Sequence, residues 1–156
     1  MLNRPQTLIG IIGAGQATPA GYEQAREVGR LVAGRGAAVV CGGLSGIMEA
    51  ACRGCTEGGG LAIGILPGGE ATTANPFVTL AIPTNMGHAR NVIIAHAARA
   101  LIAIEGEFGT LSEMAIGLKI GRPVIALGAW PNLPGVHYAA SPAEAVDMAF
   151  AKLATG

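Results

Sequence analysis

Four short segments rich in glycine could hold an anionic ligand. Glycine lets a backbone approach a ligand closely, and the free amide groups at the start of a following helix favour a phosphate. The segments are Gly13-Ala14-Gly15, Gly42-Gly43 with Gly46 behind it, Pro67-Gly68-Gly69 and Gly106-Glu107-Phe108-Gly109. They predict phosphate-binding loops, in which the candidate ligand-binding residues are Gly13, Gly15, Gly42, Gly43, Gly46, Gly106 and Gly109.

Three polar side chains near these segments could act on such a ligand. Thr110 follows the last segment and could both begin a helix and donate to a phosphate. Glu113 stands three residues later, and this spacing from Thr110 also matches a capping box, which needs no ligand. Arg90 is expected in the first turns of a helix, where the helix dipole disfavours a cation. It therefore indicates either an anionic partner or a plain surface position.

Two common nucleotide chemistries do not fit the sequence. The segment Gly13–Gly15 lacks the third glycine of the dinucleotide motif, because Thr18 stands at that position. The second predicted strand ends in Cys41, where a dinucleotide ribose would require an acidic residue. The phosphate-loop pattern GxxxxGK[ST] is also absent from the chain. We therefore expect neither a nicotinamide enzyme nor an ATPase, and no bound cofactor.

The residues that bind metals are dispersed along the chain. His88, His96 and His137 stand singly, and the pair Cys52 and Cys55 has no second ligand pair. A lone CxxC could form a redox pair or half of a metal site, but it also places two small side chains one helical turn apart. We favour the last interpretation and predict no metal site.

The elements that would carry these residues alternate between strand and helix. Apolar runs predict strands at 7–12, 37–41, 61–66, 78–82, 100–104 and 124–127. Helical spacing predicts helices at 22–35, 46–57, 87–98, 110–120 and from Ser141 onward, where Ser141 and Glu144 form a capping box. The Thr-rich stretch 70–76 predicts a loop.

Continuous apolar strands that alternate with helices are typical of a parallel sheet covered on both faces. The sequence thus predicts a single α/β domain over 1–156, a three-layer Rossmann-like doubly wound fold with a mainly parallel sheet. In such a sheet, ligands bind at the carboxyl ends of the strands.

The charge balance and the lengths of the apolar runs limit the classes of partner that this protein can bind. Lys and Arg total 10, as do Asp and Glu, so no basic surface for nucleic acid is expected. No apolar stretch approaches the ~20 residues of a membrane span, and the first residues lack the organisation of a signal peptide. We expect a cytoplasmic protein whose partner is a phosphorylated small molecule, with neither nucleic acid nor membrane involved.

Several segments together resemble the Lonely Guy (LOG) superfamily, whose members were long labelled lysine decarboxylases. The segment 42–48 (GGLSGIM) resembles its GGxxG[LI]M motif, and 64–67 (GILP) resembles its G[IV]xP strand end. The segment 86–91 (MGHARN) resembles its MxxRK motif, shifted by one residue, and 106–113 (GEFGTLSE) resembles its signature PGGxGTxxE. The resemblance covers roughly residues 7–128.

Family members cleave the N-glycosidic bond of nucleoside 5′-monophosphates, which implies Arg90 and Glu113 as catalytic residues and Gly109 and Thr110 as the phosphate site. This chain departs from the signature, with Glu105 in place of its Pro and Glu107 in place of its second Gly. The variant is similar to a short branch that includes molybdenum cofactor carrier proteins, which bind a pterin phosphate without catalysis.

Three hypotheses follow from this resemblance. The protein is a nucleoside monophosphate phosphoribohydrolase, or a non-catalytic carrier or sensor of a nucleotide or pterin phosphate, or an assembly module. In a carrier, Glu105 and Glu107 could bond to the N–H groups of the ligand ring. The Ala-rich stretch 93–98 suits close helix contact in a homodimer or larger homo-oligomer. Lysine decarboxylation is not expected, because the only lysines, Lys119 and Lys152, do not stand where a Schiff base with pyridoxal phosphate would be placed.

Overall fold

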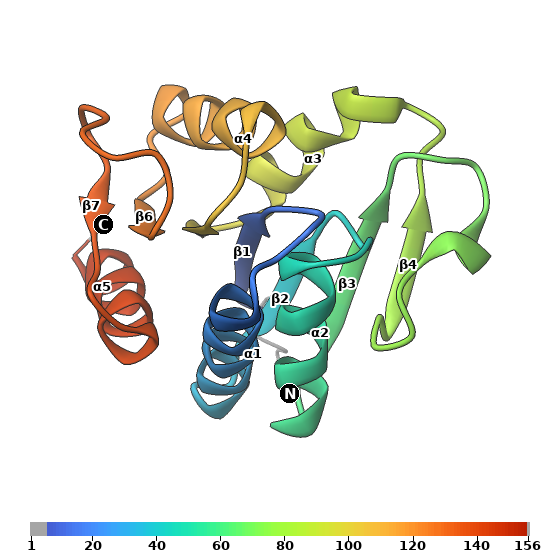
Figure 1. Cartoon of the computed structure of the whole chain (residues 1–156), viewed down its shortest axis with the longest axis horizontal. Coiled ribbons are helices and arrows are strands. Elements are labelled where there is room, and N and C mark those ends of the chain that lie inside the picture. Colours follow the sequence, from blue (N-terminus) through green and yellow to red (C-terminus); the bar gives the residue numbers. More distant parts are fainter. Residues whose placement is uncertain (1–5, 156) are drawn as a thin grey trace.

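The computed structural model describes residues 6–155, and a seven-stranded parallel sheet forms its centre (Figure 1). The strand order is β4-β3-β2-β1-β5-β6-β7, and every strand pair is parallel. The strands are β1 (Leu8–Gly13), β2 (Ala38–Cys41), β3 (Ala62–Leu66), β4 (Leu80–Pro83), β5 (Ala100–Ile104), β6 (Val124–Leu127) and β7 (His137–Tyr138).

Helices cover both faces of the sheet, which gives three layers. The helices are α1 (Pro19–Gly34), α2 (Ile47–Glu57), α3 (Arg90–Ala97), α4 (Phe108–Lys119) and α5 (Pro142–Ala154), with short 3-10 turns η1 (Ala71–Thr73) and η2 (Gly87–Ala89). The core between α1, α2, α5 and one face contains residues such as Val28 and Ile102, and the core under α3 and α4 contains Ile94 and Leu101. The predicted Rossmann-like fold is confirmed. No helix between residues 6 and 155 is long and apolar enough to cross a membrane.

The order of the strands fixes where a ligand can enter. From β1 the chain proceeds outward through β2, β3 and β4, and then returns to place β5 on the other side of β1. The loops that follow β1 and β5 therefore diverge and leave a crevice at the carboxyl edge. The glycine segments at 13–15 and 106–109 lie at this switch in strand order.

Most of the predicted elements are confirmed, and the differences have local causes. Ser141 accepts a hydrogen bond from the Glu144 amide at 3.2 Å, which confirms the predicted cap of α5. The capping box predicted at Thr110 is wrong, because α4 already begins at Phe108 and Thr110 is buried in its first turn. The predicted loop 70–76 contains η1, and β7 has only two residues, too few to leave a pattern.

Candidate ligand-binding site

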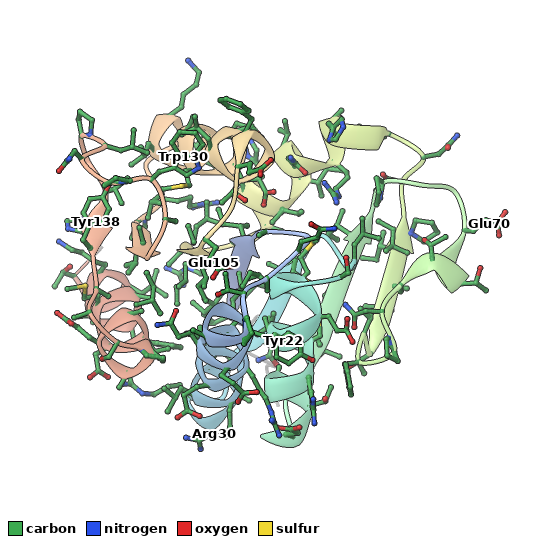
Figure 2. All side chains as sticks on the ribbon, in the orientation of Figure 1. Tyr22, Arg30, Glu70, Glu105, Trp130 and Tyr138 are labelled. Carbon is green, nitrogen blue, oxygen red and sulfur yellow. The ribbon has the colours of Figure 1, made fainter. Side chains whose placement is uncertain are left out.

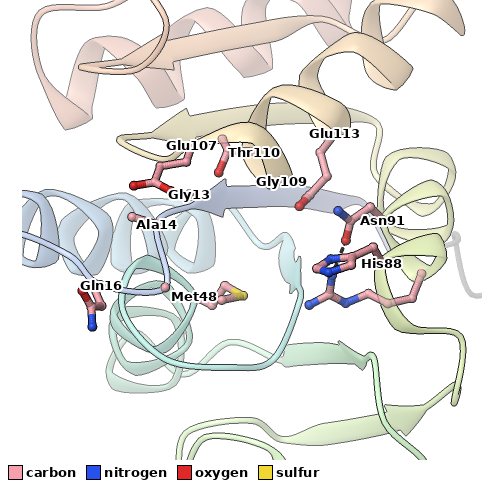
Figure 3. Close-up of a pocket in the computed structure, with 12 residues that line it drawn as sticks. Gly13, Ala14, Gln16, Met48, His88, Asn91, Glu107, Gly109, Thr110 and Glu113 are labelled. Atoms are coloured by element: carbon pink, nitrogen blue, oxygen red, sulfur yellow. Dashed lines mark hydrogen bonds between the residues drawn. The ribbon is translucent and has the colours of Figure 1, made fainter.

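A cavity of about 480 Å³ opens at the carboxyl ends of β1 and β5 (Figure 3). The loop after β1, the first turn of α2, η2 with the start of α3, and the first turns of α4 form its walls. The lining residues are Gly13, Ala14, Gly15, Gln16, Met48, His88, Arg90, Asn91, Glu107, Gly109, Thr110 and Glu113.

Arg90 is held in the wall of this cavity by neighbouring groups. Its Nε donates to the Ile65 carbonyl oxygen at 2.9 Å, and its Nη1 donates to Asn91 Oδ1. The side chain is only 7% exposed, so the surface position considered for it is wrong. A Cβ at position 42 would lie 2.7 Å from Arg90 Nη2. Gly42 therefore makes room for the guanidinium.

A chain of polar contacts joins the start of α3 to the start of α4. Asn91 Nδ2 donates to Ser112 Oγ at 3.2 Å, and Ser112 Oγ donates to the Gly109 carbonyl oxygen at 2.7 Å. Because Asn91 also accepts from Arg90, the Arg90 guanidinium and the Gly109 carbonyl group belong to one hydrogen-bond network. Asn91 stands where the superfamily motif has Lys, and its amide can both accept and donate in this network.

Glu113 lines the cavity from α4. Its side chain is buried, and Oε2 has no hydrogen-bond partner among the described residues. Burial raises the pKa of Glu113 to about 8, against the opposing charge of Arg90. The salt bridges formed within residues 6–155 do not join the two side chains. At neutral pH the carboxyl group is therefore mainly protonated, while Arg90 keeps its charge.

The N-terminal end of α4 offers free amide groups to the cavity. The N-cap residue Glu107 forms no side-chain cap hydrogen bond. The first amides of a helix have no carbonyl partner within the helix, and the dipole gives that end a partial positive charge. Gly109 and Thr110 both line the cavity there. The uncapped turn, the Arg90 charge and the neutral Glu113 together favour an anionic ligand.

Glu105 is directed elsewhere, toward the start of α1. Its carboxylate accepts from Thr18 Oγ1 and, at 3.1 Å, from the Thr18 amide. Figure 2 shows Glu105 beside the start of α1. A Cβ at position 21 would lie 2.2 Å from Glu105 Oε1, so Gly21 makes this approach possible. Glu105 does not line the cavity, whereas Glu107 does. Of the two side chains in the signature loop, only that of Glu107 is therefore placed at the cavity.

The sequence candidates divide into lining and shaping residues. Arg90, Glu113, Thr110, Gly13, Gly15 and Gly109 line the cavity, whereas Gly42, Gly43, Gly46 and Gly106 do not. The non-lining glycines permit close packing: a Cβ would lie 2.2 Å from Thr110 Oγ1 at Gly106 and 2.3 Å from the Ala14 carbonyl oxygen at Gly46. Sequence reasoning considered Glu107 only for a carrier, and it did not select Ala14, Gln16, Met48, His88 and Asn91, which all lie beside a selected residue or within a quoted motif.

The cysteines form a separate buried group. The sulfur atoms of Cys41 and Cys52 lie 3.4 Å apart, and all three cysteines are buried and free. The sequence pair Cys52 and Cys55 is thus not the pair in closest contact. Burial raises the pKa of the Cys55 thiol to about 11. Among residues 6–155, no three His, Cys, Asp or Glu side chains gather to hold a metal ion.

Fold and cavity together define a Rossmann-like α/β protein with an anion-favouring site at the switch in strand order. The model of the SLOG cluster4 family matches residues 6–151, and the chain belongs to this family. A protein of Archaeoglobus fulgidus, itself uncharacterized, is 44% identical over 139 residues, which are 89% of this chain and 91% of the relative.

Two solved structures are similar over almost their whole length. The molybdenum cofactor binding protein of Rippkaea orientalis is 33% identical with a TM-score of 0.91, covering 97% of this chain and 99% of that one. The molybdenum cofactor carrier protein of Chlamydomonas reinhardtii is 33% identical with a TM-score of 0.88, covering 96% and 99%. The predicted membership of the LOG superfamily, in a branch similar to the carrier proteins, is confirmed.

Proposed function

We propose that this protein binds a pterin phosphate of the molybdenum cofactor type and carries it without altering it. The observation that carries the proposal is the similarity, over nearly the full chain, to two proteins described as binding or carrying that cofactor. The cavity supports it, because its volume of about 480 Å³ lies in the range of small-molecule sites.

The site residues have distinct roles in this proposal. The amides of Gly109 and Thr110 at the start of α4 bind the phosphate, as helix N-termini commonly do. Arg90 supplies a positive charge from the opposite wall. Glu113 is protonated at neutral pH and donates a hydrogen bond to the ligand from its carboxyl group. Glu107 accepts from an N–H group of the ring.

Gly109 allows a sharp test of this arrangement. A Cβ at this position has no atom within 4 Å, so a side chain fits. Gly109→Asp places a carboxylate in the phosphate site, while an acidic residue in the first turn stabilises the helix. Gly109→Asn has nearly the same shape without the charge and is the matched control. The wild-type protein and both variants are produced in bacteria that make the cofactor and are purified without oxygen.

The readouts are molybdenum by elemental mass spectrometry and released pterin by fluorescence after oxidation. We expect both in the wild type and in Gly109→Asn, and an at least tenfold loss in Gly109→Asp at an unchanged melting temperature. A wild-type protein that contains neither molybdenum nor pterin, and gains none from a cofactor-loaded donor protein, would contradict the proposal.

A second function is favoured by one observation, the burial of Glu113 in the cavity wall, which raises the pKa of its carboxyl group. A carboxylic acid with a pKa near 8 can donate a proton to a leaving base, as general acids in glycosidic bond cleavage do. As a second candidate we infer hydrolysis of nucleoside 5′-monophosphates to free base and ribose 5-phosphate.

Incubation of the pure protein with AMP, GMP and CMP, followed by chromatography of the free bases, separates the two functions. In a hydrolase, Glu113→Gln would lose base release while AMP still binds. In a carrier, no base appears with either protein.

A further inference from the structure

The only tryptophan of the chain, Trp130, contacts the start of α4 from the segment between β6 and β7 (Figure 2). Its indole Nε1 donates to the Glu107 carbonyl oxygen at 3.1 Å. Its ring meets Phe108 at 5.7 Å between centroids, tilted by 45°. Trp130 does not line the cavity, yet it touches the two residues that precede Gly109.

The Glu107 carbonyl group determines how the next amide group points. It accepts from the Leu111 amide at 3.0 Å as well as from Trp130. In a trans peptide the carbonyl and the following N–H point in opposite directions. Fixing the carbonyl toward α4 and Trp130 therefore directs the Phe108 amide out of the N-terminal end of the helix, where an anion would be bound.

The two residues before this peptide have a backbone conformation that is not intrinsically stable. Glu105 has φ of 54° and Gly106 has φ of 105°. A non-glycine residue is disfavoured in this region, so the loop depends on neighbours to retain its conformation. Glu105 is held by Thr18, and the Glu107 end is held by Trp130.

Trp130 is itself held in a disfavoured conformation. Its φ is 30°, which is rare for a large side chain. The Tyr138 hydroxyl group, from β7, donates to the Trp130 carbonyl oxygen and accepts from the Leu133 amide at 2.9 Å. Tyr138 of β7 therefore anchors the backbone of Trp130, and the indole extends from this anchored backbone to the signature loop.

We propose that Trp130 is a positioning residue for the anion site: its indole N–H holds the peptide between Glu107 and Phe108 so that the amides of α4 face the phosphate. The inference rests on the proposed phosphate site at α4. Glu113 lines the same cavity, is only 9% exposed and has no partner for Oε2 among the described residues, which is an independent indication that a ligand binds there. In this arrangement the β6–β7 segment sets the affinity for the phosphate without touching the ligand.

Trp130→Phe tests this role, because it removes the N–H and keeps an aromatic ring. The control Tyr22→Phe also removes a single polar hydrogen from an aromatic side chain, but in α1 and outside the cavity lining. Binding of inorganic phosphate and of AMP is measured by calorimetry. We expect Trp130→Phe to bind both roughly three- to tenfold more weakly, about the effect of one hydrogen bond. Tyr22→Phe should bind within twofold of the wild type.

Amide signals in nuclear magnetic resonance spectra distinguish a loss of the α4 amide positions from a general destabilisation of the protein. In the wild type, phosphate should shift the Phe108 and Gly109 amides; in Trp130→Phe these shifts should shrink while the strand amides remain in place. Equal affinity and equal amide shifts in Trp130→Phe would overturn the inference even if the wild type binds phosphate. If the wild type binds neither probe, the phosphate site fails and the inference with it.

Discussion

Glu113 and Arg90 show how burial changes the chemistry of single side chains. Both are buried in the cavity wall, and neither is neutralised by an ion pair within the described residues. Desolvation disfavours the charged form of each, which raises the pKa of Glu113 and lowers that of Arg90. Because only the carboxyl group is neutralised near pH 7, this part of the cavity wall keeps the positive charge of Arg90.

The raised pKa of Glu113 makes folding stability depend on pH. The folded state retains this proton up to about pH 8, whereas the unfolded chain releases it near the ordinary glutamate value of 4.5. The stabilisation is complete below pH 4.5 and is lost as pH rises toward 8, on the order of 5 kcal/mol for this shift. We expect Glu113→Gln to remove this decline, measured by urea unfolding between pH 5 and 8.5. Parallel pH profiles of wild type and variant would contradict it.

Sequence reasoning found the important polar residues but not their environment. Arg90 and Glu113 could be selected because the superfamily motifs place them 23 residues apart. The burial of Arg90 could not be read from position 90, because it depends on Gly42 and Ile65 in distant segments. Glu105 was interpreted as a possible contact to the ligand. Its actual partner, Thr18, could not be recognised because it lies 87 residues away in the chain.

At the scale of elements, α1 and α2 pack closely through glycine. A Cβ at Gly54 would lie 1.8 Å from the Arg26 carbonyl oxygen, and a Cβ at Gly29 would lie 2.1 Å from the Ala51 carbonyl oxygen. Each helix therefore presents a glycine to the backbone of the other. This contact sets the position of α2, whose first turn carries Met48 into the cavity wall.

Gly54→Ala should separate the two helices. The added methyl group meets backbone rather than a flexible side chain, so we expect destabilisation of about 1–3 kcal/mol despite the better helix propensity of alanine. Gly34→Ala is the matched control: it lies at the end of α1 with no atom within 4 Å of its Cβ, and it should be neutral or slightly stabilising. Thermal unfolding of both variants measures the difference. Equal stability of the two would show that α1 and α2 can shift apart freely.

The strands could be predicted because buried parallel strands are uninterrupted apolar runs, as in β2 and β5. The start of α4 could not, because Glu107 at the N-cap leaves the helix without a side-chain cap. The sequence rules for helix ends assume that the protein caps its own helix. Here no side chain caps the first turn of α4, which lies at the cavity. The capping rule therefore placed the start of the helix at Thr110, two residues late.

At the scale of the whole molecule, ligand binding and stability are linked. A ligand that binds only the folded state at 100 times its dissociation constant stabilises it by about 2.7 kcal/mol. For a chain of this size that corresponds to a rise in melting temperature of roughly 5–10 °C. We expect AMP or inorganic phosphate to raise the melting temperature of the wild type and of Gly109→Asn, but not of Gly109→Asp. A rise of the same size in all three would place the anion elsewhere.

The buried cysteines make local opening of the native protein measurable by thiol labelling. Cys41, Cys52 and Cys55 are all of its thiols, and each is shielded from solvent by β2, α2 and their neighbours. A thiol reagent can label them only when this part of the molecule opens, so the labelling rate counts local opening events in the native state. Since Cys41 directly precedes Gly42, which makes room for Arg90, that rate reports motion at the back of the ligand cavity without any introduced probe.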